Sequence, residues 1–254
     1  MVGQPGWELW GPWEYGDEVR DAILEAGQEY GIRQVGARTY PTSCLESGWI
    51  PSPVPAIYTG EELKPYRQWL SAKSYEAMAS LGGSFYSDTI TDYYLTPFDL
   101  GYGPFVKFDH DFVGRAALEK SAGDQKRKKI TLVWNGDDVA RSFASLSHTG
   151  DISKYIDLPL ANYATLPFDK VLKDGAIVGL STYTGYTYNE RAVISLAVVD
   201  IAHAEPGTKL TLVWGEEGRG SSKPTVERHT QTEIRVTAAP APISEVARVA
   251  YRPK

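Results

Sequence analysis

The sequence contains almost no cysteine. Cys44 is the only one among 254 residues, which excludes an intrachain disulfide and a cysteine-rich metal site. A single thiol agrees with a reducing, intracellular compartment. The N-terminus has no basic stretch followed by an apolar core, and no uninterrupted apolar run is long enough to cross a bilayer. We therefore expect a cytoplasmic protein with no membrane partner.

Basic residues are outnumbered by acidic ones. Lys and Arg together number 26 against 32 Asp and Glu, which gives a net charge of −6, whereas a general nucleic-acid-binding surface requires a basic excess. The sequence also lacks a phosphate loop, a dinucleotide-binding glycine pattern, a zinc-protease motif and a serine-hydrolase elbow. Its four histidines are far apart and have no metal-ligand spacing. These absences predict no nucleic-acid partner and no metal.

What is present is typical of a folded protein, with 42% hydrophobic and 23% charged residues. Residues 7–10 alternate between apolar and polar, residues 17–30 carry apolar side chains at spacings of three and four, and residues 32–40 read as extended. This predicts strand, helix, strand. From Pro41 to about Leu70, prolines and aromatics predict a packed irregular loop. A role in a site and a role as a domain-bridging cover are both open for that loop.

The second half reads as β-structure. Apolar or alternating runs rich in β-branched and aromatic residues, separated by glycine turns, occupy 129–134, 176–183, 192–199, 209–214 and 232–237. Several short strands with few helical patterns predict a small antiparallel barrel or sandwich. The predicted fold class is therefore α+β.

Several segments carry a family resemblance. Residues 7–12 (WELWGP), 36–48 (GARTYPTSCLESG), 101–118 and 179–185 resemble segments of the glycine-cleavage T-protein (aminomethyltransferase) superfamily. The runs LESGWIPSPVPAIYTG (45–60), GGSF (82–85), GYGPFVKFDHDF (101–112) and NGDD (135–138) are similar to those of bacterial O-demethylases that act on vanillate, 3-O-methylgallate or syringate. The resemblance implies a partial folate-binding α/β domain over 1–124, followed by an antiparallel β-barrel over 125–254, the C-terminal barrel of the T-protein.

The resemblance also implies a reaction and a cofactor: transfer of a methyl group from a methoxylated aromatic acid to N5 of tetrahydrofolate. Glu8 would anchor the pterin ring through a bidentate contact, Tyr40 would donate a hydrogen bond to the departing oxygen, and Trp49 would form an aromatic wall. Each residue also has a plainer reading. Glu8 would be an exposed strand residue, Tyr40 a local hydrogen-bonding group, and Trp49 a core residue.

Two positions depart from the glycine-cleavage pattern: Tyr40 and Cys44 stand where that enzyme has arginines, which weighs against aminomethyl transfer. Members of the family also have a substantial portion ahead of the strand containing Glu8. The resemblance therefore implies a partial site that is completed by an N-terminal partner chain or a homo-oligomer. Two alternatives stay open: a non-catalytic folate-binding or interaction module, and a demethylase-like enzyme acting on a methylated sulfonium or amine.

Overall fold

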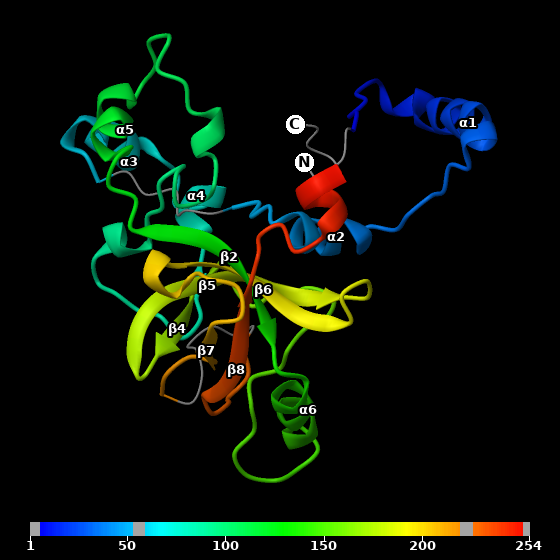
Figure 1. Cartoon of the computed structure of the whole chain (residues 1–254). Helices are drawn as coiled ribbons and strands as arrows, with labels where there is room; N and C mark the ends of the chain where they lie inside the picture. The colour runs from blue at the N-terminus through cyan, green and yellow to red at the C-terminus, as the bar shows by residue number, and fades with distance from the viewer. Residues whose placement is uncertain (1–5, 53–58, 219–225, 251–254) are drawn as a thin grey trace.

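The computed structural model describes residues 6–52, 59–218 and 226–250. Its centre is a closed barrel whose strands follow the order β2-β6-β5-β4-β7-β8, with every neighbouring pair antiparallel (Figure 1). The strands are β2 (Arg127–Trp134), β4 (Asp169–Lys173), β5 (Ala176–Thr187), β6 (Ala192–Asp200), β7 (Lys209–Trp214) and β8 (Thr232–Ala239). The predicted α+β class with an antiparallel barrel is confirmed.

The centre of the barrel is filled by side chains, as expected for a barrel of this size. Trp134 of β2 and Trp214 of β7 meet edge to face there, with ring centroids 5.3 Å apart. Strand β6 is apolar on both faces. Its inward residues Val193, Ala197 and Val199 join this core, and its outward residues pack under α2. A strand covered on both sides reads as a continuous apolar run, which is how β6 reads in the sequence.

The remaining elements are mostly short helices. They are η1 (Trp13–Tyr15), α1 (Gly16–Gly27), η2 (Gln28–Tyr30), α2 (Thr39–Ser47), η3 (Glu61–Leu63), α3 (Lys64–Trp69), α4 (Tyr75–Met78), η4 (Ile90–Tyr93), η5 (Gly103–Phe105), α5 (Arg115–Ser121), α6 (Gly136–Ser145), η6 (Ile201–His203) and the π-helical turn η7 (Val246–Ala250). A parallel pair, β1 (Leu81–Gly82) and β3 (Leu166–Pro167), lies outside the barrel. Figure 1 shows α3 and α5 in a lobe on one side and α6 at the opposite end from α2.

The NGDD run at 135–138 caps α6. The side chain of Asn135 accepts a hydrogen bond from the backbone N–H of Asp138 at 3.1 Å, which satisfies a free donor of the first turn. The Asp138 carboxylate is buried and accepts from the Arg235 side chain of β8 at 2.8 Å and 2.9 Å. This bonding lowers the pKa of Asp138 to about 2. The run therefore fastens α6 to the barrel.

Residues 6–38 form an arm that leaves the body of the protein. The predicted helix is present as α1, but the flanking segments are not strands, and no strand forms among the described residues ahead of Leu81. None of the arm's side chains is buried, and Figure 1 shows α1 standing apart from the barrel. A strand requires a neighbour to accept and donate its backbone hydrogen bonds, and the described chain offers these segments none.

The expected irregular loop after Pro41 begins instead with α2, which takes over the last residues of the predicted extended segment. Pro41 falls in the first turn of α2, where its missing N–H has no helical acceptor to lose. Gly48 ends the helix in the left-handed conformation at φ 70°, a position that glycine adopts without strain. Pro53 and Pro55 of the predicted loop lie outside the described residues.

The segment Gly82–Phe85 enters the barrel wall between β4 and β7. These two strands pair directly only at Val171–Leu212 and Leu172–Thr211. At the next position the Ser84 hydroxyl takes the place of a direct bond: it accepts from the N–H of Lys170 at 2.8 Å and donates to the carbonyl of Val213 at 2.7 Å. Ser84 is buried. Its hydroxyl therefore supplies hydrogen-bond partners to backbone groups of both strands within the barrel wall.

We predict that Gly83→Ala lowers the free energy of unfolding of the protein. Gly83 has φ 99°, and a β-carbon there would collide with the carbonyl oxygen of Phe168. Strain of this kind costs about 1–3 kcal/mol even before the collision is counted, so the free energy of unfolding in urea should fall by at least about 2 kcal/mol. Gly123→Ala is the matched control, because a β-carbon at Gly123 meets nothing within 4 Å. Equal stability of the two variants would contradict this account of Gly83.

Candidate functional site

Helix α2 is docked on the outer face of β5. Cys44 and Leu45 are completely buried there. Leu45 lies against Gly185, where an added β-carbon would come within 2.8 Å of the leucine side chain. Tyr183 packs against the same apolar cluster as Leu45. Residues 183 and 185 share one face of a strand because side chains alternate, so this face of β5 seats the helix.

This docking places Tyr40 and Trp49 in contact at the two ends of α2. Their rings meet edge to face, with centroids 6.1 Å apart and planes at 86°. Tyr40 is 51% exposed, and Trp49 is half-buried. Partial desolvation, then Cys44 and then Glu8 raise the pKa of Tyr40. Two of the three predicted site residues thus touch, and Glu8 lies within electrostatic reach of Tyr40.

Glu8 itself is exposed and lies on the irregular start of the arm rather than on a strand. Glu46 holds several elements together. Its carboxylate oxygens each accept from the side-chain amide of Asn189 at 3.1 Å, and its backbone carbonyl accepts from the N–H of Ser244 at 3.1 Å. Glu46 therefore ties α2 to the β5–β6 turn and to the C-terminal segment.

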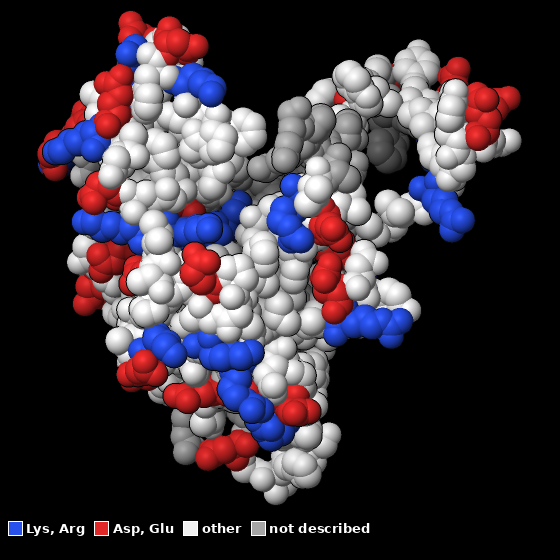
Figure 2. Space-filling view, viewed as in Figure 1, with Lys and Arg blue, Asp and Glu red and all other residues white. Residues whose placement is uncertain are grey.

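A groove of about 820 Å³ runs from Trp49 along the start of β2. Figure 2 shows the surface hollowed between the lobe and the part that carries α2. Its aromatic walls come from Trp49, Phe98, Tyr102 and Phe105, and Lys128 and Lys129 add positive charge, with the Lys129 ammonium 5.2 Å from the Tyr102 ring centroid. Flat aromatic walls beside two ammonium groups suit a ligand with a planar ring and an anionic tail. A folate has both features, so these residues fit one.

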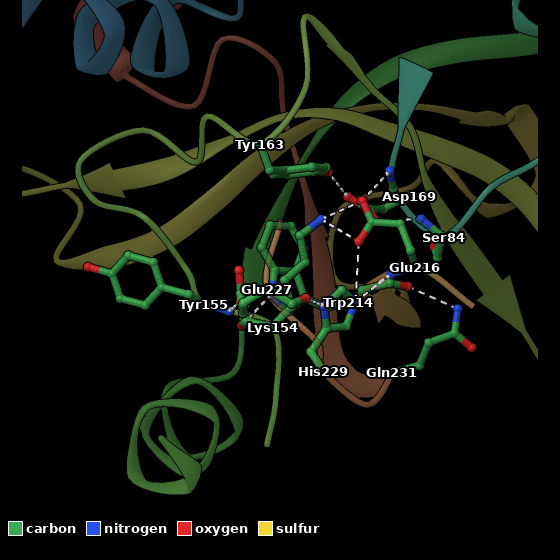
Figure 3. A network of polar contacts seen from close by, with 12 residues as sticks. Ser84, Lys154, Tyr155, Tyr163, Asp169, Trp214, Glu216, Glu227, His229 and Gln231 are labelled. Atoms are coloured by element: carbon green, nitrogen blue, oxygen red, sulfur yellow. Dashed lines mark hydrogen bonds and ion pairs between the residues drawn. The ribbon is translucent and has the colours of Figure 1, made fainter. Parts of the chain in front are cut away.

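Apart from the groove, a cluster of ionisable side chains lies buried between the segment 82–85 and the end of β7. The ammonium of Lys154 is 2.9 Å from the carboxylate of Glu216, and the side chain of Lys154 is 1% exposed (Figure 3). The same ammonium lies 3.1 Å from the centroid of the Tyr163 ring. Asp169 accepts hydrogen bonds from the Tyr163 hydroxyl and, at 2.9 Å, from the N–H of Ser84.

His229 completes this network as a neutral ring. Its Nε2 accepts from the backbone N–H of Glu216 at 2.9 Å, which requires an unprotonated Nε2, so Nδ1 carries the proton and donates to the carbonyl of Glu227 at 2.8 Å. The 3.2 Å separation between Nε2 and the Glu216 carboxylate is therefore a contact and not an ion pair. His229 therefore has a structural role in this network.

The network holds two carboxylates and one ammonium out of water. Burial lowers the pKa of Lys154, although Asp169 and Glu216 oppose the shift. Burial also acts to raise the pKa of Glu216, but Lys154 outweighs it and the net pKa is lowered. Asp169 keeps a pKa raised to about 6, chiefly by burial. Because the donors and acceptors are mostly engaged with one another, we interpret the network as structural. No group of three or more candidate metal ligands occurs among the described residues.

Comparisons with known proteins agree with the resemblance. No family model matches the sequence. The chain is 46% identical to the syringate O-demethylase of Sphingobium sp. (strain NBRC 103272 / SYK-6), over 99% of this chain and 54% of that protein. It is 31% identical to the sesamin methylene transferase of Sinomonas sp. (strain No.22), over 95% of this chain and 54% of that protein. It is 35% identical to the aminomethyltransferase of Streptomyces coelicolor, over 88% of this chain and 45% of that protein.

Among solved structures, the glycine cleavage system aminomethyltransferase T from Bartonella henselae matches with a TM-score of 0.48 and 14% identity, over 92% of this chain and 45% of that one. The chain is similar to members of the T-protein (aminomethyltransferase) superfamily, and a C-terminal portion of that family fits it. Its highest identity among these relatives is to the syringate O-demethylase, which agrees with the sequence motifs. The chain spans about half the length of the curated relatives it matches. In the part of the chain that the structure describes, no helix is long and apolar enough to span a bilayer.

Sequence reasoning missed the partners of α2 on β5 and the whole buried network. The pattern Tyr183-x-Gly185 within a strand was the available signal for the first, since a glycine inside a strand often marks a close approach by another element. Lys154 offered no signal. It lies outside any motif, and its partners Asp169 and Glu216 are far away in the sequence.

Asp169→Asn should remove a pH-dependent loss of stability. A carboxyl whose pKa is higher in the folded state than its usual 3.8 favours folding at low pH, and that advantage disappears as pH rises through about 6. Between pH 4.5 and 7.5 we expect wild type to lose about 1–2 kcal/mol from this group, and the asparagine variant to lack that loss.

Urea unfolding at the two pH values measures the effect. Asparagine preserves the shape and can still bond Ser84 and Tyr163, so the fold should survive. Asp174→Asn serves as the control, because the Asp174 side chain is 86% exposed. Parallel pH dependence in wild type and Asp169→Asn would show that Asp169 does not titrate in this range.

Proposed function

We propose that this chain forms one part of a tetrahydrofolate-dependent O-demethylase, which moves a methyl group from a methoxylated aromatic acid to N5 of tetrahydrofolate. The observation that carries the proposal is the contact of Tyr40 with Trp49 beside an aromatic groove, in a chain 46% identical to a syringate O-demethylase. We keep 1–124 and 125–254 as the proposed division between the folate region and the barrel domain.

Tyr40 is suited to assist the leaving group. When the bond between the methyl carbon and the aryl oxygen breaks, negative charge develops on that oxygen, and a hydrogen-bond donor held nearby stabilises it. The raised pKa of Tyr40 keeps its hydroxyl protonated at neutral pH, and its exposed side leaves room for a substrate. Alignment of donor, ether and acceptor would supply much of the remaining reduction of the barrier, on the order of 7–11 kcal/mol in favourable cases.

Tetrahydrofolate would supply the nucleophilic N5 amine. Trp49 would give its ring system a flat wall, and Lys128 and Lys129 would attract the carboxylates of its tail along the groove. Glu8 would accept two hydrogen bonds from the pterin, a contact that requires the arm to be held in place. Its reach to Tyr40 supports this role.

The arm supports the proposal of a partner chain. Trp7 and Trp13 are each 95% exposed and Trp10 is 86% exposed, and more large apolar side chains follow along α1. Large apolar side chains exposed together along one segment mark a place where another polypeptide packs. We propose that the occupant corresponds to the portion of the relatives that this chain does not match, about half of their length.

The proposed activity is tested by supplying that portion. Purified chain is incubated with vanillate or syringate and tetrahydrofolate, alone and with a polypeptide carrying the unmatched portion of the syringate O-demethylase, and 5-methyltetrahydrofolate is measured. We expect product only in the combined reaction. Folate binding without turnover in both reactions would instead favour a non-catalytic folate-binding or interaction module.

In the combined reaction, Tyr40→Phe should lower kcat by about 10²–10³-fold, because a donor to a developing oxyanion is lost while the ring remains. Glu8→Ala should mainly raise the dissociation constant for tetrahydrofolate. Fluorescence titration and steady-state kinetics separate the two effects, and Glu14→Ala on the same arm is the control. If both site variants changed binding alone, the role assigned to Tyr40 would be wrong.

Replacing Trp7 and Trp13 with serine should weaken capture of the supplied portion by more than tenfold, since buried tryptophans usually dominate an interface. Light scattering and titration calorimetry give the stoichiometry and affinity. Trp69→Ser is the control, because Trp69 is 78% exposed but lies in the lobe rather than on the arm. If Trp69→Ser weakened capture as much as the replacement of Trp7 and Trp13, the interface would lie elsewhere.

A further inference from the structure

The aromatic groove is formed where two parts of the chain meet at the start of β2. One wall is the segment 94–105, called the wall segment below, whose side chains Phe98, Tyr102 and Phe105 line the groove. The floor comes from the run 125–129, which leads into β2. The wall segment lies outside the strands of the barrel. The width of the groove therefore depends on the contacts that tie the wall segment to β2.

The ion pair of Arg127 and Asp99 is the first of these contacts. Nη2 of Arg127 donates to the Asp99 carboxylate at 2.9 Å and to the backbone carbonyl of Tyr94 at 3.1 Å. The Asp99 side chain is only 7% exposed. A buried carboxylate that loses its cation is strongly destabilised, and charge-assisted hydrogen bonds are stronger than neutral ones. The pair is therefore a strong connection between β2 and the wall segment.

The turn that holds Asp99 continues directly into the aromatic wall. The N–H of Thr96 donates to the Asp99 carboxylate at 2.9 Å, and the Thr96 hydroxyl accepts from the N–H of Asp99 at 3.1 Å. Further along the same turn, the N–H of Tyr102 donates to the carbonyl of Pro97 at 2.8 Å. Because these bonds make the turn one unit, a displacement of Asp99 would carry the rings of Phe98 and Tyr102 with it.

Two weaker contacts act beside the ion pair. The side-chain amide of Gln125 donates to the carbonyls of Phe98 and Arg127, each at 3.0 Å, and the Lys129 ammonium lies 5.2 Å from the centroid of the Tyr102 ring. Residues 127 and 129 point to the same face of a strand. The wall segment is thus held against one face of β2, and within this set the Arg127–Asp99 pair supplies the buried charge.

We propose that Arg127 and Asp99 are positioning residues for the cofactor groove: their ion pair holds the aromatic wall at the distance from β2 that a planar ring requires. The inference rests on the proposed function for the identity of the ligand, tetrahydrofolate. Among the described residues that line the groove, neither member of the pair is found, so their effect on binding acts through the wall segment.

The test compares the whole chain as wild type, Arg127→Met, Arg127→Lys and Lys126→Met. Methionine removes every donor of Arg127 and keeps an unbranched side chain, whereas lysine keeps the charge but not the planar fork. Lys126 is the matched control, because it is adjacent to Arg127 and its partner Asp124 is 73% exposed. Both methionine variants lose one positive charge at the same end of β2, so they weaken general attraction of an anionic ligand alike.

Hydrogen exchange tests the tie without any ligand. The amides of residues 100–106 should exchange at least about tenfold faster in Arg127→Met, because charge-assisted hydrogen bonds are lost. We expect an intermediate increase in Arg127→Lys and no change in Lys126→Met. If Arg127→Met does not fold, Arg127→Lys decides the comparison. Exchange as slow as in wild type in the folded Arg127 variants would overturn the proposal.

Titration calorimetry with tetrahydrofolate gives the second readout, on the chain alone and combined with the unmatched portion of the syringate O-demethylase. The dissociation constant should rise about tenfold in Arg127→Met, less in Arg127→Lys, and less than about twofold in Lys126→Met. Equal losses in Arg127→Met and Lys126→Met would show attraction by charge alone and would overturn the positioning role.

Kinetics then separates this proposal from the proposed function. In the combined reaction Arg127→Met should raise KM for tetrahydrofolate and leave kcat nearly unchanged, because the Tyr40 hydroxyl is untouched. A fall in kcat at unchanged KM would overturn the proposal. If the wild-type combination neither binds tetrahydrofolate nor forms product, the proposed function fails, but the exchange results still decide whether Arg127 and Asp99 hold the wall segment.

Discussion

The hydroxyl of Ser84 bridges β4 and β7 at the point where the two strands stop pairing directly. Strands β4 and β7 diverge after two direct pairs, and at the next position the serine stands between the N–H of Lys170 and the carbonyl of Val213. A barrel with this gap unfilled would expose backbone groups within its wall, where each unmade hydrogen bond costs about 1–3 kcal/mol. This part of the barrel wall therefore depends on the inserted segment Gly82–Phe85.

The charges around Ser84 reinforce the same junction. The N–H groups of Gly83 and Ser84 donate to Glu216 and Asp169, so two carboxylates hold the inserted backbone at 3.0 Å and 2.9 Å. Buried carboxylates need compensation, and Lys154 supplies one positive charge for both. One positive charge does not fully compensate two buried carboxylates, and burial raises the pKa of Asp169 to about 6. A buried carboxyl with a raised pKa costs stability at neutral pH. Asp169 nevertheless holds the inserted segment in the barrel wall, because it accepts a hydrogen bond from the N–H of Ser84.

The barrel was predictable and the arm was not, for a common physical reason. Strands such as β6 and β7 carry their pattern locally, because each has its partners within the chain and buries its apolar residues against them. The segments on either side of α1 carry a similar alternation, but the described chain contains nothing for them to pair with, so the pattern produced no strand. Helix α2 was missed because its apolar face is only Cys44 and Leu45, and its stop signal, Gly48, was read as part of a loop. The family motifs marked Tyr40 and Trp49 as separate site residues, whereas the contact between their rings became visible only in the structure.

The candidate site lies at the boundary between the exposed arm and the buried face of α2. Residues 6–40 bury no side chain, yet four residues later Cys44 is completely covered. A site built across this boundary has one wall fixed by the barrel, where Leu45 is seated at Gly185, and one wall, bearing Glu8, whose position depends on whatever covers the tryptophans of the arm. Pre-organisation is therefore unequal: the proposed donor is already oriented, and the proposed pterin anchor is not. In such an arrangement, association of a covering polypeptide would act mainly on cofactor binding and only secondarily on the leaving group, because Tyr40 takes its orientation from the barrel.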